Sequence, residues 1–211
     1  MPTEAALEAA ANLRQGSLFD WYVIPLLALV VYVYAVEVEK RNWNAVLAGL
    51  AFWGMDWFNE IWNALVFHFS DFAPVWGAPG DTAFLILIGL NIEICFMFAT
   101  AGVVFSKILP DDPKQKILGV PNRLFIACAG SAFCVFVEFF LNAADALTWD
   151  WAWWNRGAPW LIFLIGYLHF FVVAFWVHDM KSRKSQLTVL GVIYAFDALC
   201  LLVFGAALGW I

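Results

Sequence analysis

The chain has 211 residues, of which 64% are hydrophobic and 13% are charged. Soluble globular domains are far more polar, so this composition excludes a soluble protein and is typical of a multi-pass membrane protein. The formal net charge of −6 favours no nucleic-acid partner. No polar linker is long enough to separate two units, and residues 1–211 are therefore predicted to form a single transmembrane domain.

A short polar N-terminal segment, residues 1–17, opens the chain. It carries Glu4 and Glu8 and lacks a basic n-region, so it is not predicted to be a cleavable signal peptide. Six apolar runs follow, each long enough to cross the roughly 30 Å hydrocarbon core as a helix. We therefore predict an all-α, polytopic membrane protein with six transmembrane helices, near residues 19–37, 43–69, 82–106, 122–147, 159–179 and 187–210.

The basic residues indicate how these spans are oriented. All of the 11 Lys and Arg residues except Arg14 and Arg156 lie in or beside the first, third and fifth connections. Because cytoplasmic loops carry the excess of Lys and Arg, these connections are predicted to be cytoplasmic, with both termini outside. The chain is expected to be a multi-pass integral membrane protein in contact with membrane lipids, and to lie in the cytoplasmic membrane if its source is bacterial.

Tryptophan gathers in the two longer connections on the opposite side. Two interpretations are open: these residues anchor the helices as an interfacial aromatic belt, or they also cover a cavity that opens outward or into the outer leaflet. The residues concerned are Trp76, Trp149, Trp151, Trp153, Trp154 and Trp160.

The strongest functional signal is a set of acidic residues inside the apolar runs. A charged side chain at mid-bilayer costs roughly 2.5–3.5 kcal/mol on insertion scales. We therefore expect these acids to face one another or a cavity, and we interpret them as candidate catalytic residues. They are Asp56, Glu60, Glu93, Glu138 and Asp197.

Helical spacing places further polar groups beside these acids. Positions i, i+4 and i+7 share a helix face, and Asp56, Glu60 and Asn63 have this spacing. Glu138 and Asn142 likewise lie one turn apart. The other spans contribute polar groups at a similar depth, which predicts one shared intramembrane site. The candidate binding residues on those spans are Asn91, His169 and Tyr194.

The second and fourth spans begin alike, which suggests an internal repeat of helical hairpins. Residues 48–52 read AGLAF and residues 129–133 read AGSAF, and each helix leads into a loop that contains Gly-Ala-Pro. Each loop feeds a span with an Ile-Gly pair, at 88–89 and at 165–166. A parallel repeat of this type would place the polar groups of both copies around a central site.

Aromatic residues, 18% of the chain, favour one kind of chemistry. A buried carboxylic acid protonates an alkene or epoxide, aromatic faces stabilise the carbocation by up to about 2 kcal/mol each when desolvated, and a second carboxylate removes the final proton. The alternative is that the aromatic residues only pack the helices. Those predicted to line the site are Trp53, Trp57, Trp62 and Phe139.

Three short stretches resemble the integral membrane terpene cyclases and, more loosely, the membrane carotenoid hydratases. They are WFNEIW around Glu60, the pair Leu90-Asn91, and YAFDALC around Asp197. The resemblance implies a lyase or isomerase that protonates, cyclises or hydrates an isoprenoid lipid, served by Glu60 and Asp197. The cyclases usually have seven spans, whereas this chain is predicted to have six.

In this interpretation Glu60 or Glu138 donates the proton, and Asp56 and Asp197 support or accept it. No cofactor is predicted. The substrate partner is a lipid-soluble small molecule.

Other functions fit the same residues. Glu60, Glu93 and Glu138, with Asn142 and His169, could form a carboxylate-rich site for a divalent metal, although no span carries the usual Glu-x-x-His pair. The cluster could instead carry protons or cations in a transporter. The chain could also be a homo-oligomer or a small subunit of a membrane complex, with the small residues of 205–209 packed against a partner.

Overall fold

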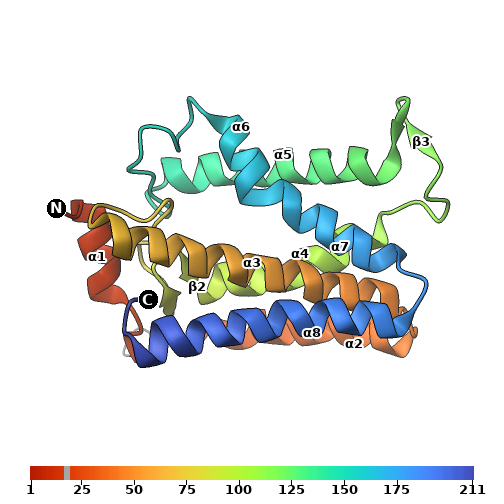
Figure 1. The fold of residues 1–211 in the computed structure, drawn as a ribbon, viewed down its shortest axis with the longest axis horizontal. Helices are drawn as coiled ribbons and strands as arrows, with labels where there is room; N and C mark the ends of the chain where they lie inside the picture. The colour runs from red at the N-terminus through yellow and green to blue at the C-terminus, as the bar shows by residue number, and fades with distance from the viewer. Residues whose placement is uncertain (17–19) are drawn as a thin grey trace.

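A computed structural model describes residues 1–16 and 20–211. The predicted start of the first span, at residue 19, lies outside the described residues. Most of the chain is helical, and its long helical stretches run side by side along the long axis of the molecule (Figure 1). These stretches are α2 (Val23–Glu39), α3 (Trp43–Ser70), α4 (Ile92–Lys107), α5 (Asn122–Ala143), the continuous rod of α6 (Pro159–Leu161), η2 (Ile162–Leu168) and α7 (His169–Asp179), and the rod of α8 (Arg183–Cys200) with η3 (Leu201–Ala207).

Helix α3 is the centre of the bundle and packs against α4, α7 and α8. Small residues allow α3 and α4 to approach closely. A Cβ atom added at Gly102 would lie 2.5 Å from the Cβ of Phe52 and 2.9 Å from the Cα of Gly49. Small residues at helix crossings are the usual means of close packing inside membranes. Helix α5 lies further out and is attached to the bundle through η2 and α7.

Three helical stretches in the described part of the chain are long and apolar enough to cross a membrane: 122–143, 159–179 and 183–207. Helices α2 and α4 have only 17 and 16 residues, or about 24–26 Å of helix. Helix α3 is long, but its middle carries two buried acids and two buried amides. The three spans bear out an apolar, multi-pass helical architecture.

The predicted boundaries of the third and fourth spans are wrong. Residues predicted to open the third span form an antiparallel hairpin, β1 (Leu85–Leu87) and β2 (Leu90–Asn91), and α4 starts only at Ile92. Asn91 ends the hairpin, because its side chain accepts the backbone N–H of Ile94 and caps α4. Helix α5 stops at Ala143 rather than at the predicted residue 147. Asp145, with a φ of 56°, turns the chain just after the helix.

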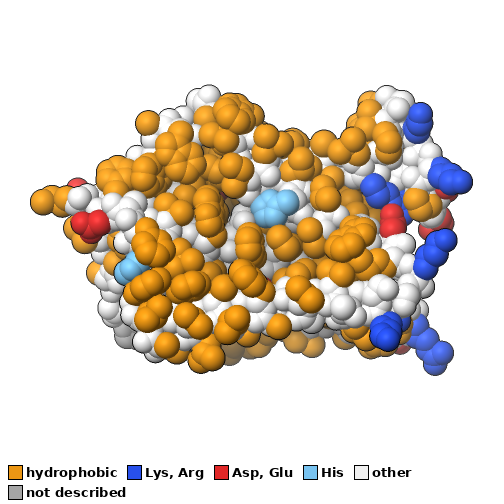
Figure 2. Space-filling model, in the orientation of Figure 1, with side chains coloured by type: hydrophobic (Ala, Val, Ile, Leu, Met, Phe, Trp, Pro, Cys, Tyr) orange, Lys and Arg blue, Asp and Glu red, His pale blue; other side chains and the backbone are white. Residues whose placement is uncertain are grey.

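The ends of the bundle differ in charge and in structure. Both termini lie at one end, whereas all Lys and Arg residues except Arg14 and Arg156 belong to segments at or near the other end, where those visible in Figure 2 gather (Figures 1 and 2). A second short hairpin, β3 (Lys116–Ile117) and β4 (Val120–Pro121), lies at the basic end. The N-terminal segment, predicted only as polar, folds into α1 (Glu4–Asn12). At the terminal end of the bundle, Ala9 of α1 packs in one apolar cluster with Leu85 of β1.

The segments that suggested an internal repeat differ in structure. The Gly-Ala-Pro motif at 157–159 leads directly into a helix, whereas the motif at 77–79 is followed by the β1–β2 hairpin. The Ile-Gly pair at 165–166 lies in the π-helix η2, and the pair at 88–89 forms the hairpin turn. These parts of the two predicted helical repeats are therefore not structural copies.

Candidate functional site

Three of the predicted acids line one cavity. Asp56 and Glu60 enter it from α3 and Glu138 enters it from α5, while none of the lining residues is basic. The cavity leaves about 40 Å³ for the centres of water-sized molecules, and one water needs about 10–15 Å³ on this measure. It therefore has room for about three waters or for a small apolar group. Its aromatic wall consists of Trp76, Phe98, Trp154, Tyr167 and Phe170.

Glu60 is held by the loop that follows α3. Its Oε1 accepts the indole N–H of Trp76 at 2.8 Å, and its Oε2 has no hydrogen-bond partner in the protein. Asn63, one turn later on α3, fixes that loop, because it donates to the Trp76 carbonyl and accepts the backbone N–H groups of Val75 and Trp76. Asn63 is thus a positioning residue for the Trp76–Glu60 pair.

Glu138 and Asp56 are equally buried, with 4% and 2% of their surface exposed. Glu138 Oε2 and Asp56 Oδ2 also have no hydrogen-bond partner in the protein. Buried polar atoms in folded proteins nearly always have a partner, from the protein or from water. Three orphaned carboxyl oxygens around one small cavity therefore indicate a place where water or a reacting group is bound.

Two residues at the edge of the cavity, one on α4 and one on α5, are partly exposed. Met97 on α4 lines it and is 43% exposed. Leu141 on α5 lines it as well and is half-buried. The neighbouring helix α5 packs against η2 and α7 and not closely against α4. The partly exposed residues at this edge of the cavity are apolar.

The π-helix η2 forms the wall opposite α3. Asn59 Nδ2 donates to the carbonyl oxygens of Ile165 and Gly166, at 3.0 and 3.4 Å. Its Oδ1 lies 3.1 Å from His169 Nε2, which carries the proton because the amide oxygen only accepts. A π-turn widens a helix and is frequent at functional sites. Here it places Gly166 and Tyr167 in the cavity wall.

Other predicted site residues have structural roles. Glu93 accepts hydrogen bonds from the hydroxyl groups of Tyr22 and Thr82 and from the backbone N–H of Ala83, away from the cavity. Asn91 caps α4, as described above. Asn142 closes the turn after α5, because its Nδ2 donates to the Leu147 carbonyl at 3.0 Å.

Asp197 lies behind the cavity on α8 and does not line it. It is 4% exposed, and neither of its carboxyl oxygens has a hydrogen-bond partner in the protein. Helix α8 packs against α3, which carries Asp56 and Glu60. Tyr194, one turn earlier, donates to the Leu50 carbonyl at 2.9 Å.

The four aromatic residues predicted to line the site lie outside the cavity wall. Trp53 donates to the Cys95 thiol, Trp62 packs on Trp76 with ring centroids 5.9 Å apart, and Phe139 packs on Trp149. Trp57 is a half-buried neighbour of the Ile61 and Leu87 cluster.

Several cavity residues escaped the sequence analysis. Asn59 had a usable signal, because it follows Asp56 by three positions and so shares its helix face. Trp76 and Trp154 belong to the Trp-rich connections and line the cavity, with 7% and 0% of their surface exposed. Gly89 and Tyr167 had no local signal.

A metal site finds no support in the geometry. Among residues 1–16 and 20–211, no three or more His, Cys, Asp and Glu side chains are grouped so that they could hold a metal ion. Glu93 and His169, two of the proposed ligands, do not line the carboxyl cavity.

Comparison with known proteins identifies relatives and a family of the chain but assigns it no chemistry. A protein of Archaeoglobus fulgidus named only as an uncharacterized protein is 60% identical over 211 residues, which is 100% of both chains. A second protein of that organism, named in the same way, is 55% identical over 53 residues, or 25% of this chain and 95% of the relative.

No solved structure matches the chain. Neither relative's name points to terpene cyclases or carotenoid hydratases. A family model matches residues 3–206, and the chain therefore belongs to the family described as an uncharacterized membrane protein family.

Proposed function

We propose that the chain is a membrane-embedded enzyme whose carboxyl cavity performs acid–base chemistry on the unsaturated end of an isoprenoid-like, lipid-soluble substrate. One observation carries the proposal. Glu60 and Glu138 come from different helices to one cavity, and each has a carboxyl oxygen without a hydrogen-bond partner in the protein. A substrate that enters between α4 and α5 meets both groups.

The proposed arrangement in the membrane has six spans, with both termini outside. Its support is the alignment of the six long helical stretches and the position of both termini opposite the basic end (Figures 1 and 2). Hydrophobic side chains cover most of the middle of the face shown in Figure 2. The short helices α2 and α4 match a thinner hydrocarbon layer, or tilt less than their neighbours.

The cavity volume limits the part of the substrate that reaches the acids. Room for about three waters suits the end of a chain, such as a terminal alkene or epoxide, while the rest of the chain lies between α4 and α5. Phe98, Phe170 and Tyr167 then face the reacting end and stabilise positive charge through their ring faces.

In the proposed reaction, the carboxyl O–H of Glu60 or Glu138 gives its proton to one alkene carbon. The π electrons form the new C–H bond, and the other carbon becomes a carbocation. A carboxylate, the second glutamate or Asp56, then removes a proton from a neighbouring carbon, and those C–H electrons form a new double bond. The net change is isomerisation of the double bond, without an external oxidant or reductant. When a second alkene of the same chain attacks the carbocation first, its π electrons form a new C–C bond, and loss of a proton beside the resulting cation gives a cyclised product.

The resemblance to terpene cyclases gives partial support. Of the residues that carry it, Glu60 lines the cavity, Asn91 caps a helix, and Asp197 is buried on α8 outside the cavity lining. The proposed role of Asp197 is therefore to exchange a proton with Asp56, not to touch the substrate. A proton-coupled transporter would use the same row of carboxyls but would need a path from both ends of the bundle.

The test follows hydrogen isotopes. The purified protein, in vesicles prepared in D₂O, is incubated with linear polyprenes and with their terminal epoxides, and the extracted lipids are analysed by mass spectrometry. Deuterium in an isomerised, cyclised or hydrated product, dependent on both glutamates, is the expected result. No deuterium incorporation by the wild-type protein from any of these substrates would contradict the proposal.

A further inference from the structure

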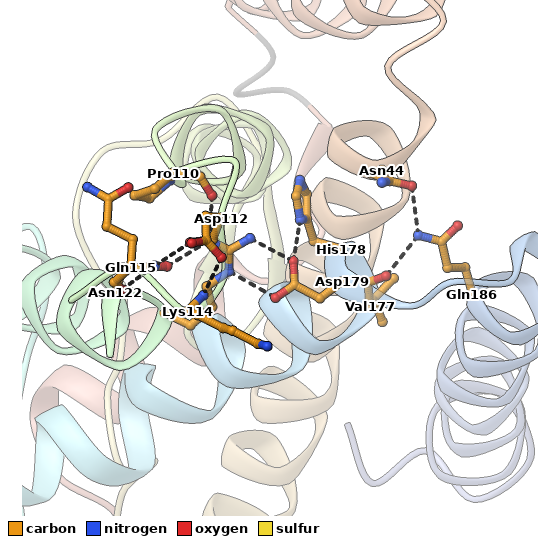
Figure 3. Close-up of polar contacts among 11 residues, drawn as sticks. Asn44, Pro110, Asp112, Lys114, Gln115, Asn122, Val177, His178, Asp179 and Gln186 are labelled. Carbon is orange, nitrogen blue, oxygen red and sulfur yellow. Dashed lines mark hydrogen bonds and ion pairs between the residues drawn. The ribbon is translucent and has the colours of Figure 1, made fainter. Parts of the chain in front are cut away.

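A polar pocket lies at the basic end of the bundle, far along the helices from the termini. It is formed where the start of α8 meets the end of α7 and the connection between α4 and α5 (Figure 3). It leaves about 460 Å³ for water-sized molecules, more than ten times the room in the carboxyl cavity. Its charged side chains are Asp111, Arg123, Asp179, Lys181 and Arg183.

One wall of this pocket is held by a double ion pair. Arg123 donates from Nε to Asp179 Oδ2 and from Nη2 to Asp179 Oδ1, both at 2.9 Å. Its Nη1 donates to the Pro110 carbonyl at 2.6 Å, and His178 Nδ1 lies 2.9 Å from Asp179 Oδ1. A forked pair of this kind fixes both side chains, so the charge of Asp179 is already matched by Arg123.

The floor of the pocket is also fixed by hydrogen bonds within the protein. Gln186 is 1% exposed and donates to Asn44 Oδ1 at 3.1 Å and to the Val177 carbonyl at 2.8 Å (Figure 3). Its Oε1 accepts Nη1 of Arg183 at 2.7 Å, which holds the guanidinium at the pocket. The protein itself therefore holds Arg183 in place at the pocket.

The pocket has an excess of positive charge. Within residues 1–16 and 20–211, Lys181 and Arg183 form no ion pair with a carboxylate. With Arg123 and Asp179 matched, these two cations outnumber the remaining acid, Asp111. The pocket is therefore complementary to an anion, such as a phosphate group.

An apolar groove continues from the same pocket along the membrane-embedded helices. It shares Arg123 and Asp179 with the pocket and leaves about 300 Å³ for water-sized molecules. Its other lining residues are apolar and come from α5 and α7, and three of them, Leu124, Val172 and Trp176, are 48–57% exposed. Trp176 is the largest of these side chains.

We propose that the pocket and the groove together bind one membrane lipid, with its phosphate headgroup at Lys181 and Arg183 and its chain along Trp176. A free phosphate would use the pocket alone, and a neutral lipid would use the groove alone. The adjoining arrangement, polar at the helix ends and apolar along the helices, fits a molecule with both parts.

Native mass spectrometry of the full chain in mild detergent tests this binding. Added phosphatidylglycerol should be retained as a single bound molecule more tightly than phosphatidylcholine of the same chain length. Lys181→Gln should weaken phosphatidylglycerol retention about fivefold. The matched control is Lys184→Gln, which removes the same charge from an exposed position outside the pocket. An equal loss in both variants would overturn a defined headgroup site.

The groove is tested separately. Trp176→Ala should weaken retention about threefold to tenfold, whereas Trp160→Ala, at an equally exposed tryptophan outside the groove, should not. Millimolar inorganic phosphate should not displace the lipid. Displacement by phosphate together with an unaltered Trp176→Ala variant would show that the pocket binds a free anion, and would overturn the lipid assignment.

Discussion

Glu60 and Glu93 both lie in apolar runs, yet the structure surrounds them in opposite ways. Glu93, in the first turn of α4, accepts hydrogen bonds from Tyr22, Thr82 and Ala83 and ties three segments together. Glu60, in the middle of α3, accepts one indole hydrogen bond and leaves Oε2 free at a cavity. A satisfied carboxylate holds a structure, whereas an unsatisfied one at a cavity is available for chemistry.

The largest expected effect is on activity at the cavity. Glu60→Gln and Glu138→Gln keep the side-chain shape but cannot transfer a proton, so deuterium incorporation into the isoprenoid product should fall about 100- to 10,000-fold. The free energy of unfolding should change by less than about 1 kcal/mol, because neither substitution alters packing. The two readouts are isotope incorporation and denaturant unfolding in the same detergent.

The matched control for these variants is Glu39→Gln, at an exposed position at the end of α2. It should leave isotope incorporation unchanged. Full activity in both Glu60→Gln and Glu138→Gln would remove the catalytic assignment and leave the cavity as a packing defect filled by water.

Glu93→Ala should have the opposite profile. It leaves two hydroxyl donors and one backbone N–H without their acceptor, and each such loss costs about 1–3 kcal/mol when the group stays buried. Because these groups are only partly buried, the expected total is about 2–4 kcal/mol of unfolding free energy. Denaturant titration measures it. Glu39→Ala, which removes an exposed acid, should cost less than about 0.5 kcal/mol.

Little destabilisation by Glu93→Ala, combined with lost activity, would show that Glu93 belongs with Glu60 after all. The contrast between the two regions would then fail.

Gly89→Ala should close the cavity from the hairpin side. The added Cβ would lie 2.5 Å from Asn63 Nδ2, 2.7 Å from Trp76 Cδ1 and 2.8 Å from Glu60 Oε2. Overpacking of this kind costs about 1–3 kcal/mol, and the displaced glutamate should reduce isotope incorporation.

The matched control is Gly191→Ala on α8, where the added Cβ meets no atom within 4 Å. That variant should be stabilised by up to about 1 kcal/mol, because alanine favours helix. Equal stability of the two variants would mean that the hairpin yields, and that Gly89 does not shape the cavity.

The helical fold was predictable because long apolar runs have one main solution in a membrane. The exceptions are local and polar. The hairpin at 85–91 replaced the start of a span, because Asn91 caps α4 more favourably than it continues a helix. The predicted end of α5 was too late because nothing in the hydrophobic pattern marks the turn at Asp145.

The acids of the cavity were predictable, because apolar context marks an acid as buried and helical spacing marks its face. Their partners were not. Trp76 reaches Glu60 only because Asn63 folds the following loop back, and Tyr167 enters the wall only because η2 is a π-helix. Neither contact follows from spacing along one helix. For the same reason the sequence could not separate Glu93, whose partners come from two other segments, from Glu60.

Trp76→Phe tests the smallest of these differences, the single hydrogen bond that Glu60 accepts. The ring still fills its place against Trp154, 5.5 Å away between centroids, but Glu60 Oε1 loses its donor. A hydrogen bond to a neutral group contributes about 0.5–1.5 kcal/mol, so a drop of up to about tenfold in isotope incorporation is expected if this bond orients the acid. Trp62→Phe, whose indole packs on Trp76, is the control for lost aromatic area. If both variants lose activity equally, activity at Glu60 depends on aromatic packing and not on the hydrogen bond from Trp76. The surroundings of Glu60 would then have a mainly structural role, like those of Glu93, despite the free Oε2 oxygen.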